Sequence, residues 1–549
     1  MKDFERRLMT QNAVSDHTAQ MSLAQAEHIE LHLGQFCNNR CVFCVSGQLT
    51  EQGRAAPVST DELLARLDEA AASGVRGVTL LGGEPTLHPD FLTVLDRVVA
   101  LGFAQIVLFT NGARGRQAAF LDAVMARGPI TWRFSIQGSD AATHDAVTRR
   151  PGSFARIMAA LAHLSSHDAD ITVNLCVNAR SYASLPGYPA LVAQYGIRQL
   201  HVDVVRPKHT GVRSDEYLRD IMPRYTEMVP AFREMLAKFD ALGARCEVHV
   251  GNLPLCLMPE RADQIHHGGR PTVNITPDLS GEWKALQSKY AVQFSDATYA
   301  PGCDGCVFRP QCRGVPAKYA AFYGVDELSP LTIEQLRDCD PHQRSFALTE
   351  LRTLSALLDH PPPRSWMLRS LAPHPRDHQI VLTAEGPDGA TAQITFAARH
   401  VNGSLSVITD RMVVFVHCTV PGDQVRWVRW SMGALRAQCP TIQGIRCVDP
   451  MLWERAKRQA LQTARRLRAA SLGAFRHTRT LRMANHAGLR VDFGAADGQT
   501  LTIRIRYQPD GTLQLSFDAA QPPTAAVRSA IRQANRVVSS QSRDTRPSA

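Results

Sequence analysis

The chain has 549 residues, of which 44% are hydrophobic and 20% charged, so it can bury several cores and is neither disordered nor fibrous. Apolar runs stay short of the ~18 residues of a membrane helix, and the polar start lacks a secretion signal, which predicts a cytoplasmic protein without a membrane segment. The formal net charge of +10 is unevenly distributed. Residues 345–549 hold 27 Lys and Arg against 14 Asp and Glu, whereas residues 1–344 hold 34 against 37. This asymmetry predicts a near-neutral part and a basic part with different roles.

After a lead-in at 1–27, expected to be flexible or helical, short apolar strands alternate with helices. Strands are predicted at 29–33, 77–81, 105–109, 131–136, 171–177 and 199–205. The intervening helices are predicted near 60–71, 89–101, 117–125, 153–164 and 185–195, and a last helix at 215–242. This order favours a parallel sheet with right-handed crossovers, either open and doubly wound or closed like a barrel.

The remainder of the chain is expected to be organised differently. Residues 243–344 are rich in turns and are expected to be too irregular to continue a barrel, and residues 345–363 are expected to be a helix followed by a Pro-rich linker. Beyond residue 364, Asp-Gly and Asn-Gly pairs predict β-hairpins. These pairs are Asp388-Gly389, Asn402-Gly403, Asp497-Gly498 and Asp510-Gly511, and they suggest two similar repeats. With helices near 427–437, 451–470 and 525–538, the region 364–549 is predicted to be α+β.

Two tight clusters stand out among the thirteen cysteines. Cys37, Cys41 and Cys44 have the spacing C-x3-C-x2-C, and Cys303, Cys306 and Cys312 the spacing C-x2-C-x5-C. In a chain without an export signal, such clusters indicate metal ligands rather than disulfides. Zinc usually takes four protein ligands, whereas three thiolates on one loop suit three irons of a four-iron cluster and leave the fourth iron open. A zinc site is the alternative.

The first cysteine loop follows the first strand and carries Phe43 just before its last cysteine, and this arrangement resembles the signature of the radical S-adenosylmethionine (SAM) superfamily. Gly82-Gly83-Glu84-Pro85, at the end of the second strand, is similar to the family motif that holds the methionine amino group of SAM. Further positions that resemble cofactor contacts are Asn111, Ser135 and Asn174, with turn and core roles as the alternative. The resemblance covers residues 28–242 and implies a partial (β/α)6 TIM-like barrel.

The resemblance also implies a mechanism. SAM would chelate the open iron of the 4Fe-4S cluster on Cys37, Cys41 and Cys44. One electron, from a donor of the flavodoxin or ferredoxin type, would cleave SAM to methionine and a 5′-deoxyadenosyl radical, which abstracts hydrogen from a substrate.

The second cysteine group resembles the auxiliary-cluster region of SPASM and Twitch radical SAM enzymes. The SPASM pattern expects a further cysteine where this chain has Pro316, which argues for one auxiliary cluster, expected to be 4Fe-4S, in a domain at 243–344. Its ligands would be Cys303, Cys306, Cys312 and Cys256, with Cys339 as a rival fourth ligand. A structural zinc knuckle is the alternative.

Relatives with such a region mostly modify peptides, so a peptide or protein substrate is expected, with a small molecule or RNA as alternatives. The basic helix at 451–470 could attract RNA, an acidic leader peptide or an acidic partner, or could simply present a solvated face. The alternative outside enzymology is a zinc or iron–sulfur protein that binds nucleic acid.

Overall fold

The computed structural model describes most of the chain. The described ranges are 20–206, 213–242, 246–268, 271–277, 283–342, 360–374, 379–398, 412–420, 450–483, 488–508, 512–519 and 524–539, with single residues between 344 and 357 and between 423 and 434. Among these residues, no helix combines the length and the apolar character that a bilayer span requires.

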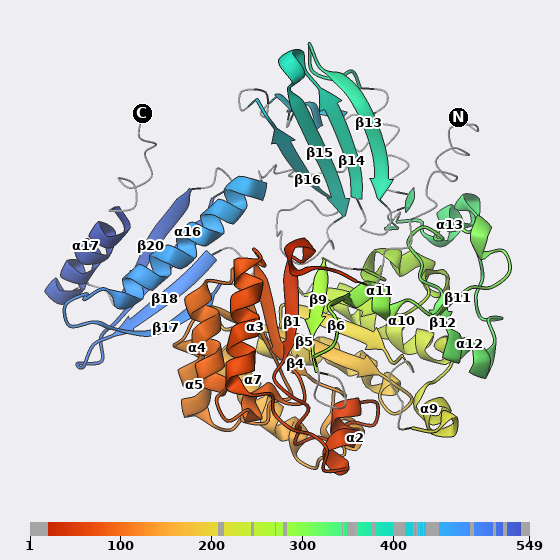
Figure 1. Ribbon diagram of the computed structural model, residues 1–549, viewed down its shortest axis with the longest axis horizontal. Helices are drawn as coiled ribbons and strands as arrows, with labels where there is room; N and C mark the ends of the chain where they lie inside the picture. Colours follow the sequence, from red (N-terminus) through yellow and green to blue (C-terminus); the bar gives the residue numbers. More distant parts are fainter. Residues whose placement is uncertain are drawn as a thin grey trace.

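A ten-stranded sheet forms the centre of the molecule (Figure 1). Its spatial order is β10-β9-β1-β2-β3-β4-β5-β6-β7-β8, and all neighbours are parallel except β10 and β9. The strands are β1 (His28–His32), β2 (Gly77–Leu81), β3 (Gln105–Thr110), β4 (Ile130–Ser135), β5 (Asp170–Val177), β6 (Gln199–Val204), β7 (Glu247–Gly251), β8 (Ile265–His266), β9 (Thr272–Ile275) and β10 (Gln287–Ser288). The predicted partial TIM-like barrel is confirmed.

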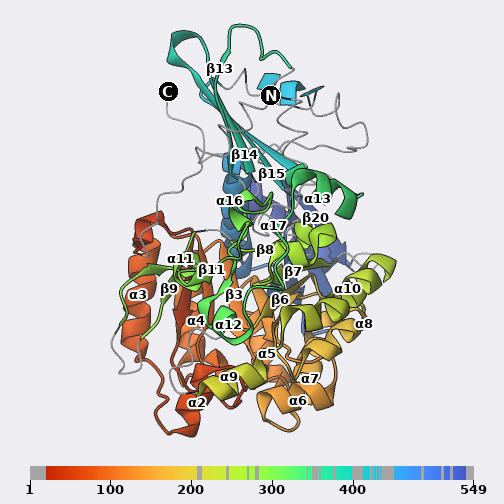
Figure 2. The same ribbon diagram turned by 90° about the vertical axis from the view of Figure 1, so that its right-hand side faces the viewer.

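Helices cover the outer side of this sheet (Figures 1 and 2). They are α3 (Thr60–Ala72), α4 (Phe91–Leu101), α5 (Ala118–Met125), α6 (Ala141–Thr148), α7 (Ser153–Ser165), α8 (Tyr188–Tyr195) and α10 (Tyr225–Leu242). Two further helices, α2 (Val45–Glu51) and α9 (Asp215–Ile221), lie below the sheet in Figure 1. The single helix predicted at 215–242 is wrong, because the chain breaks between α9 and α10. Pro223 lies in this break, and proline lacks the N–H that a continuous helix would need there.

The two faces of the sheet differ sharply in polarity. In parallel strands, residues paired across the sheet point to the same side. The helix-covered face is apolar, and six of its residues are at most 1% exposed: Ile29, Leu80, Leu108, Trp132, Leu175 and Val202. The inner face carries polar side chains, among them Glu30, Arg133, Ser135, Asn174, His201 and His249. The interior of the barrel is therefore polar.

The sheet continues beyond residue 242, contrary to the expectation that 243–344 is too irregular to join the barrel. Strands β7 to β10 all come from this region and extend the sheet at both edges. They are short and separated by turns, which hid them in the sequence. The lead-in also reaches the sheet, because Gln20 forms a bridge with Gln287. The rest of the region holds α11 (Lys289–Gln293), β11 (Ala297–Thr298), β12 (Val315–Pro316), α12 (Ala317–Tyr323) and α13 (Ile333–Cys339).

Two four-stranded antiparallel sheets form the C-terminal region, which agrees with the α+β prediction. The first contains β13 (Met367–His374), β14 (Gln379–Glu385), β15 (Thr391–Ala398) and β16 (Met412–Cys418); the second contains β17 (Arg476–Arg482), β18 (Gly488–Gly494), β19 (Thr500–Tyr507) and β20 (Leu513–Ala519). Both follow chain order. Turns lie at Asp388-Gly389 and Asp497-Gly498 as predicted, while Asn402-Gly403 and Asp510-Gly511 fall outside the described residues.

Helices α16 (Pro450–Ala469) and α17 (Ala525–Ser539) pack on the second of these sheets and share its apolar core. We call this unit, residues 450–539, the C-terminal module. It lies against the outer helices of the barrel near α4 and α5, whereas the first antiparallel sheet projects above the barrel (Figures 1 and 2).

Candidate cluster and cofactor site

The first cysteine loop lies beyond the carboxyl end of β1 and is fixed on both sides. On one side, Gly83 N donates to Gly34 O at 2.9 Å and Glu84 N donates to Phe36 O at 2.8 Å. On the other side, Val42 N donates to Val147 O at 3.0 Å, at the end of α6. Cys44 then caps the amino end of α2. The three cysteines are thus held at the edge of the barrel where the parallel strands end.

Glycine is required at two positions where this loop crosses the end of β2. Gly82 has φ +138°, and a Cβ there would lie 2.6 Å from Gly34 O. A Cβ on Gly83 would lie 2.0 Å from Phe36 O, closer than any side chain tolerates. The Gly-Gly pair therefore has a structural role in addition to the cofactor contact expected from the sequence, because it lets the cysteine loop approach the sheet.

Glu84 sits beneath the loop and is 3% exposed. Its Oε1 accepts hydrogen bonds from Thr86 N, Thr86 Oγ1 and Thr110 Oγ1, and its Oε2 accepts one from Asn111 N at 2.6 Å. Burial raises the pKa of this carboxyl despite these donors. Glu84 therefore ties the turn after β2 to the end of β3 and places negative charge close to Cys37.

The three thiols form one electrostatic group. Burial, followed by the Glu84 carboxylate, raises the pKa of Cys37 to about 12. Burial, followed by the Cys44 and Cys37 thiols, holds the pKa of Cys41 well above its ordinary value. Cys37 Sγ also accepts hydrogen bonds from Asn39 N and Asn111 Nδ2, each at 3.4 Å. Iron ligation would displace the thiol protons, and N–H donors to sulfur are typical of iron–sulfur sites, so this loop fits a bound cluster.

Unpartnered polar atoms surround the same loop. Within the described part of the chain, Asn39 Oδ1, Asn111 Oδ1 and both amide atoms of Gln48 are buried without a hydrogen-bond partner. Buried polar groups normally have partners, so this concentration marks a place where a polar ligand would complete the structure. Phe43, partly buried, and Pro85, buried, supply apolar surface nearby.

Ser135 and Asn174 are neighbours on the inner face of β4 and β5, in register with each other. Ser135 Oγ accepts a hydrogen bond from Gln137 Nε2 at 2.6 Å, and Asn174 Nδ2 donates to Asp203 Oδ2 at 3.2 Å. Both side chains are half-buried and point into the barrel interior rather than into the outer core. Cys176, on the same strand, contributes to the raised pKa of Cys41, so this face of β5 lies near the cysteine loop.

The second cysteine group gathers around the turn after β7. Burial, followed by the thiols of Cys312, Cys306 and Cys303, raises the pKa of Cys256 to about 12. Leu331 N donates to Cys306 Sγ and Gly314 N to Cys312 Sγ, each at 3.3 Å. By contrast, Cys339 is exposed at the end of α13.

The charged residues of the barrel interior were not predicted from the sequence. Lys289 Nζ donates to Glu30 Oε1 at 2.6 Å. Burial alone would raise the pKa of Glu30, but Lys289 lowers it overall, while burial raises the pKa of Asp203 although Lys289 opposes it. Gly251 makes room for this carboxylate, since a Cβ there would lie 2.0 Å from Asp203 Oδ1. The alternation of polar and apolar residues in His28–His32 and in Gln199–Val204 was the available signal.

A fixed three-cysteine loop at the carboxyl edge of a polar barrel defines the class of the domain. Residues 31–178 match the family model described as the Radical SAM superfamily, so this part of the chain is a radical SAM domain.

Several characterised relatives share this region. An AdoMet-dependent heme synthase from Methanosarcina barkeri is 31% identical over 180 residues, which cover 33% of this chain and 51% of the relative. A PqqA peptide cyclase from Ruegeria pomeroyi is 32% identical over 31% of this chain and 45% of its own. The mycofactocin maturase MftC from Mycobacterium ulcerans is 29% identical over 38% and 53%. The chain thus spans about half the length of the curated relatives it matches.

Among solved structures, SuiB from Streptococcus suis bound to its precursor peptide SuiA aligns over 60% of this chain and 87% of its own, with 14% identity and a TM-score of 0.41.

Proposed function

We propose that this protein is a radical SAM enzyme that modifies a peptide. The observation that carries the proposal is the loop of Cys37, Cys41 and Cys44, fixed to the turn at Gly83 and Glu84 within a radical SAM domain. Bound at this site, the 4Fe-4S cluster and SAM would supply a 5′-deoxyadenosyl radical on reduction by a flavodoxin- or ferredoxin-type donor.

The residues of the chain would position the cofactor and exclude water. Asn111 and Gln48 have free amide atoms at the loop and would bind polar groups of SAM, while Ser135 and Asn174 face the interior from β4 and β5. Phe43 and Pro85 would shield the cluster from solvent. The polar interior around Lys289 and Asp203 would receive the substrate group from which hydrogen is taken.

Cys256, Cys303, Cys306 and Cys312 would hold one auxiliary 4Fe-4S cluster. The effect of the other three thiols on the pKa of Cys256, together with the exposure of Cys339, supports Cys256 as the fourth ligand. With four protein ligands this cluster has no open iron, which favours a role in electron transfer or in ordering the site over direct binding of substrate.

The peptide substrate is supported by relatives named as a peptide cyclase and a maturase. The heme synthase similarity favours the second candidate, a small-molecule substrate. Arg458 and Arg466, exposed on α16, could attract an acidic leader peptide. RNA is the other acidic polymer that such a surface could bind. Measuring peptide binding in the presence of competing RNA, at several salt concentrations, separates the two.

The first test is cofactor cleavage after anaerobic reconstitution. The proposal expects about eight irons per chain, corresponding to two four-iron clusters, and release of 5′-deoxyadenosine when reductant and SAM are added. Replacing Cys37, Cys41 and Cys44 together by alanine should halve the iron and abolish cleavage. The matched control is Cys418→Ala, a buried thiol of the first antiparallel sheet, which should change neither.

Zinc in place of iron, or cleavage that persists in the triple variant, would contradict the proposal. For the substrate, a short peptide encoded beside the gene should change mass when incubated with SAM and reductant. Turnover of a tetrapyrrole in place of the peptide would establish the small-molecule alternative.

A further inference from the structure

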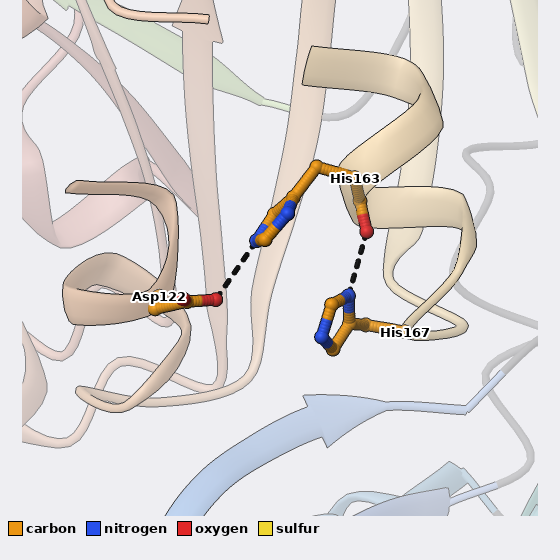
Figure 3. Close-up of side chains that lie close together, drawn as sticks. All are labelled: Asp122, His163 and His167. Atoms are coloured by element: carbon orange, nitrogen blue, oxygen red, sulfur yellow. Dashed lines mark hydrogen bonds and ion pairs between the residues drawn. The ribbon is translucent and has the colours of Figure 1, made fainter. Parts of the chain in front are cut away.

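Three potential metal ligands meet on the outside of the barrel, remote in sequence from both cysteine groups. Asp122 lies on α5, His163 lies in the last turn of α7, and His167 follows that helix. One ligand atom from each lies within 4.8 Å of the other two. The two histidines come from one turn of chain and the aspartate faces them from the neighbouring helix (Figure 3).

The hydrogen bonds leave nitrogen lone pairs where a metal would need them. His167 Nδ1 lies 2.6 Å from the carbonyl oxygen of His163, which can only accept, so Nδ1 carries the proton. In the neutral ring, Nε2 of His167 is then free to coordinate. This N–H···O=C arrangement is the usual way in which proteins orient a metal-binding histidine. His163 Nε2 lies 2.8 Å from Asp122 Oδ1, a contact in which a metal ion can take the place of the shared proton.

We propose that Asp122, His163 and His167 form a zinc-binding site. Two imidazoles and one carboxylate are a typical zinc donor set, and tetrahedral coordination requires ligand atoms roughly 3.5 Å apart. The three ligand atoms lie at most 4.8 Å apart, so small side-chain rotations bring them to that spacing. Three protein ligands leave the fourth position to water.

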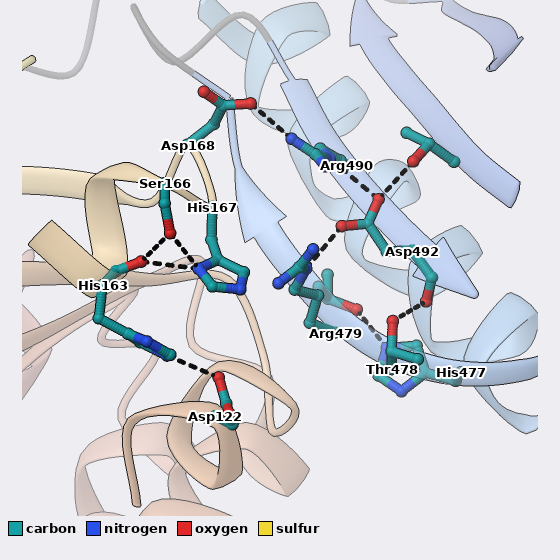
Figure 4. A network of polar contacts seen from close by, with 12 residues as sticks. Asp122, His163, Ser166, His167, Asp168, His477, Thr478, Arg479, Arg490 and Asp492 are labelled. Atoms are coloured by element: carbon teal, nitrogen blue, oxygen red, sulfur yellow. Dashed lines mark hydrogen bonds and ion pairs between the residues drawn. The ribbon is translucent and has the colours of Figure 1, made fainter. Parts of the chain in front are cut away.

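Two arginines of the C-terminal module lie beside these residues in Figure 4, and both are paired with carboxylates. Arg479 and Arg490 bind Asp492, at 2.8 and 2.9 Å. Arg490 also forms an ion pair with Asp168 at 2.6 Å. Because Asp168 directly follows His167, the loop that would carry the metal is the one that contacts the C-terminal module. Zinc would therefore fix α5, α7 and this docking loop together.

The test measures zinc in the full-length protein with its iron–sulfur centres loaded. The protein is incubated with zinc chloride, freed of excess metal and analysed for zinc and iron. We expect one zinc per chain more in the wild type than in His167→Gln, with equal iron showing that the cysteine sites are filled in both. The melting temperature of the wild type should rise with zinc and that of the variant should not.

Asp96→Asn is the matched control, because Asp96 is an exposed carboxylate on neighbouring α4 that pairs with Arg127. It should bind zinc like the wild type. Equal zinc in wild type and His167→Gln would overturn the proposal. If His167→Gln does not fold, Asp122→Asn, an exposed substitution, decides: it should weaken zinc binding by at least ~10-fold, as loss of even an outer partner does.

Discussion

Gly83 is the residue on which the cysteine loop depends most directly. Substitution by alanine would place a Cβ 2.0 Å from Phe36 O and 2.5 Å from Gln35 O, and backbone atoms cannot rotate away. We expect Gly83→Ala to displace the loop and lose its cluster, which lowers iron from about eight to about four atoms per chain and abolishes SAM cleavage.

The control for this prediction is Gly494→Ala in β18, where the nearest atom to a new Cβ is 3.4 Å away. It should retain full iron and activity. Iron analysis and 5′-deoxyadenosine release measure both variants. Normal iron content in Gly83→Ala would mean that the loop can shift without losing its ligands.

The Lys289–Glu30 pair makes a second prediction at this scale. In Lys289→Met, the Glu30 side chain stays 14% exposed and loses its cation. We expect the free energy of unfolding to fall by about 2 kcal/mol, which is less than for a fully buried pair because the Lys289 side chain is one-third exposed. In the wild type, the pKa of Glu30 is lower in the folded than in the unfolded protein, so this residue adds stability at pH values above its unfolded pKa. In the variant, burial raises the folded-state pKa of Glu30, so stability falls as pH rises. The difference between the two proteins should therefore be larger at pH 7 than at pH 5.

Urea unfolding at the two pH values measures this difference. The double variant Glu30→Gln with Lys289→Met removes both charges and should recover most of the loss. A single variant as stable as the wild type at both pH values would show that Glu30 is solvated in the folded protein.

At the scale of elements, the strand positions followed from the sequence because short apolar runs between turns are a local signal. The ends of all six predicted core strands lie within one residue of the observed ends. Deciding between an open sheet and a barrel also requires the polarity of the second face of the sheet. In β5 to β7, polar residues alternate with apolar ones, as in His201, Asp203 and His249, and such alternation in parallel strands indicates a polar interior on one side. Strands of two residues such as β8 carry too little pattern to be predicted.

The proposed auxiliary cluster is also a question at this scale, because its cysteines come from separate segments of the chain. The thiols of Cys303, Cys306 and Cys312 raise the pKa of Cys256, whereas Cys339 is exposed. In a background lacking Cys37, Cys41 and Cys44, we expect Cys256→Ala to reduce iron from about four atoms per chain to near zero. Cys339→Ala should keep all of it. Iron analysis with visible absorption measures both, and the opposite result would make Cys339 the ligand.

At the scale of the whole molecule, some basic side chains of the C-terminal module bind the barrel of the same chain. Arg465 donates to Val99 O in the last turn of α4, and Arg468 donates to Arg127 O after α5 at 2.8 Å. Arg482, 4% exposed, donates to Ala104 O at 2.8 Å. Cations at helix carboxyl ends are favourable. This role could not be predicted from the sequence, because each acceptor is a backbone carbonyl more than 300 residues away.

The joint substitution of Arg465, Arg468 and Arg482 by glutamine should therefore release the C-terminal module from the barrel. Each lost bond from a charged donor costs about 1.5 kcal/mol, so the contact should fail before either part unfolds. We expect two thermal transitions in place of one and a larger radius of gyration by small-angle scattering. Arg504→Gln, which breaks only the pair with Asp518 inside the module, is the control and should remain compact. A compact triple variant would mean that the remaining contacts, among them the Arg490–Asp168 ion pair, are enough to hold the two parts together.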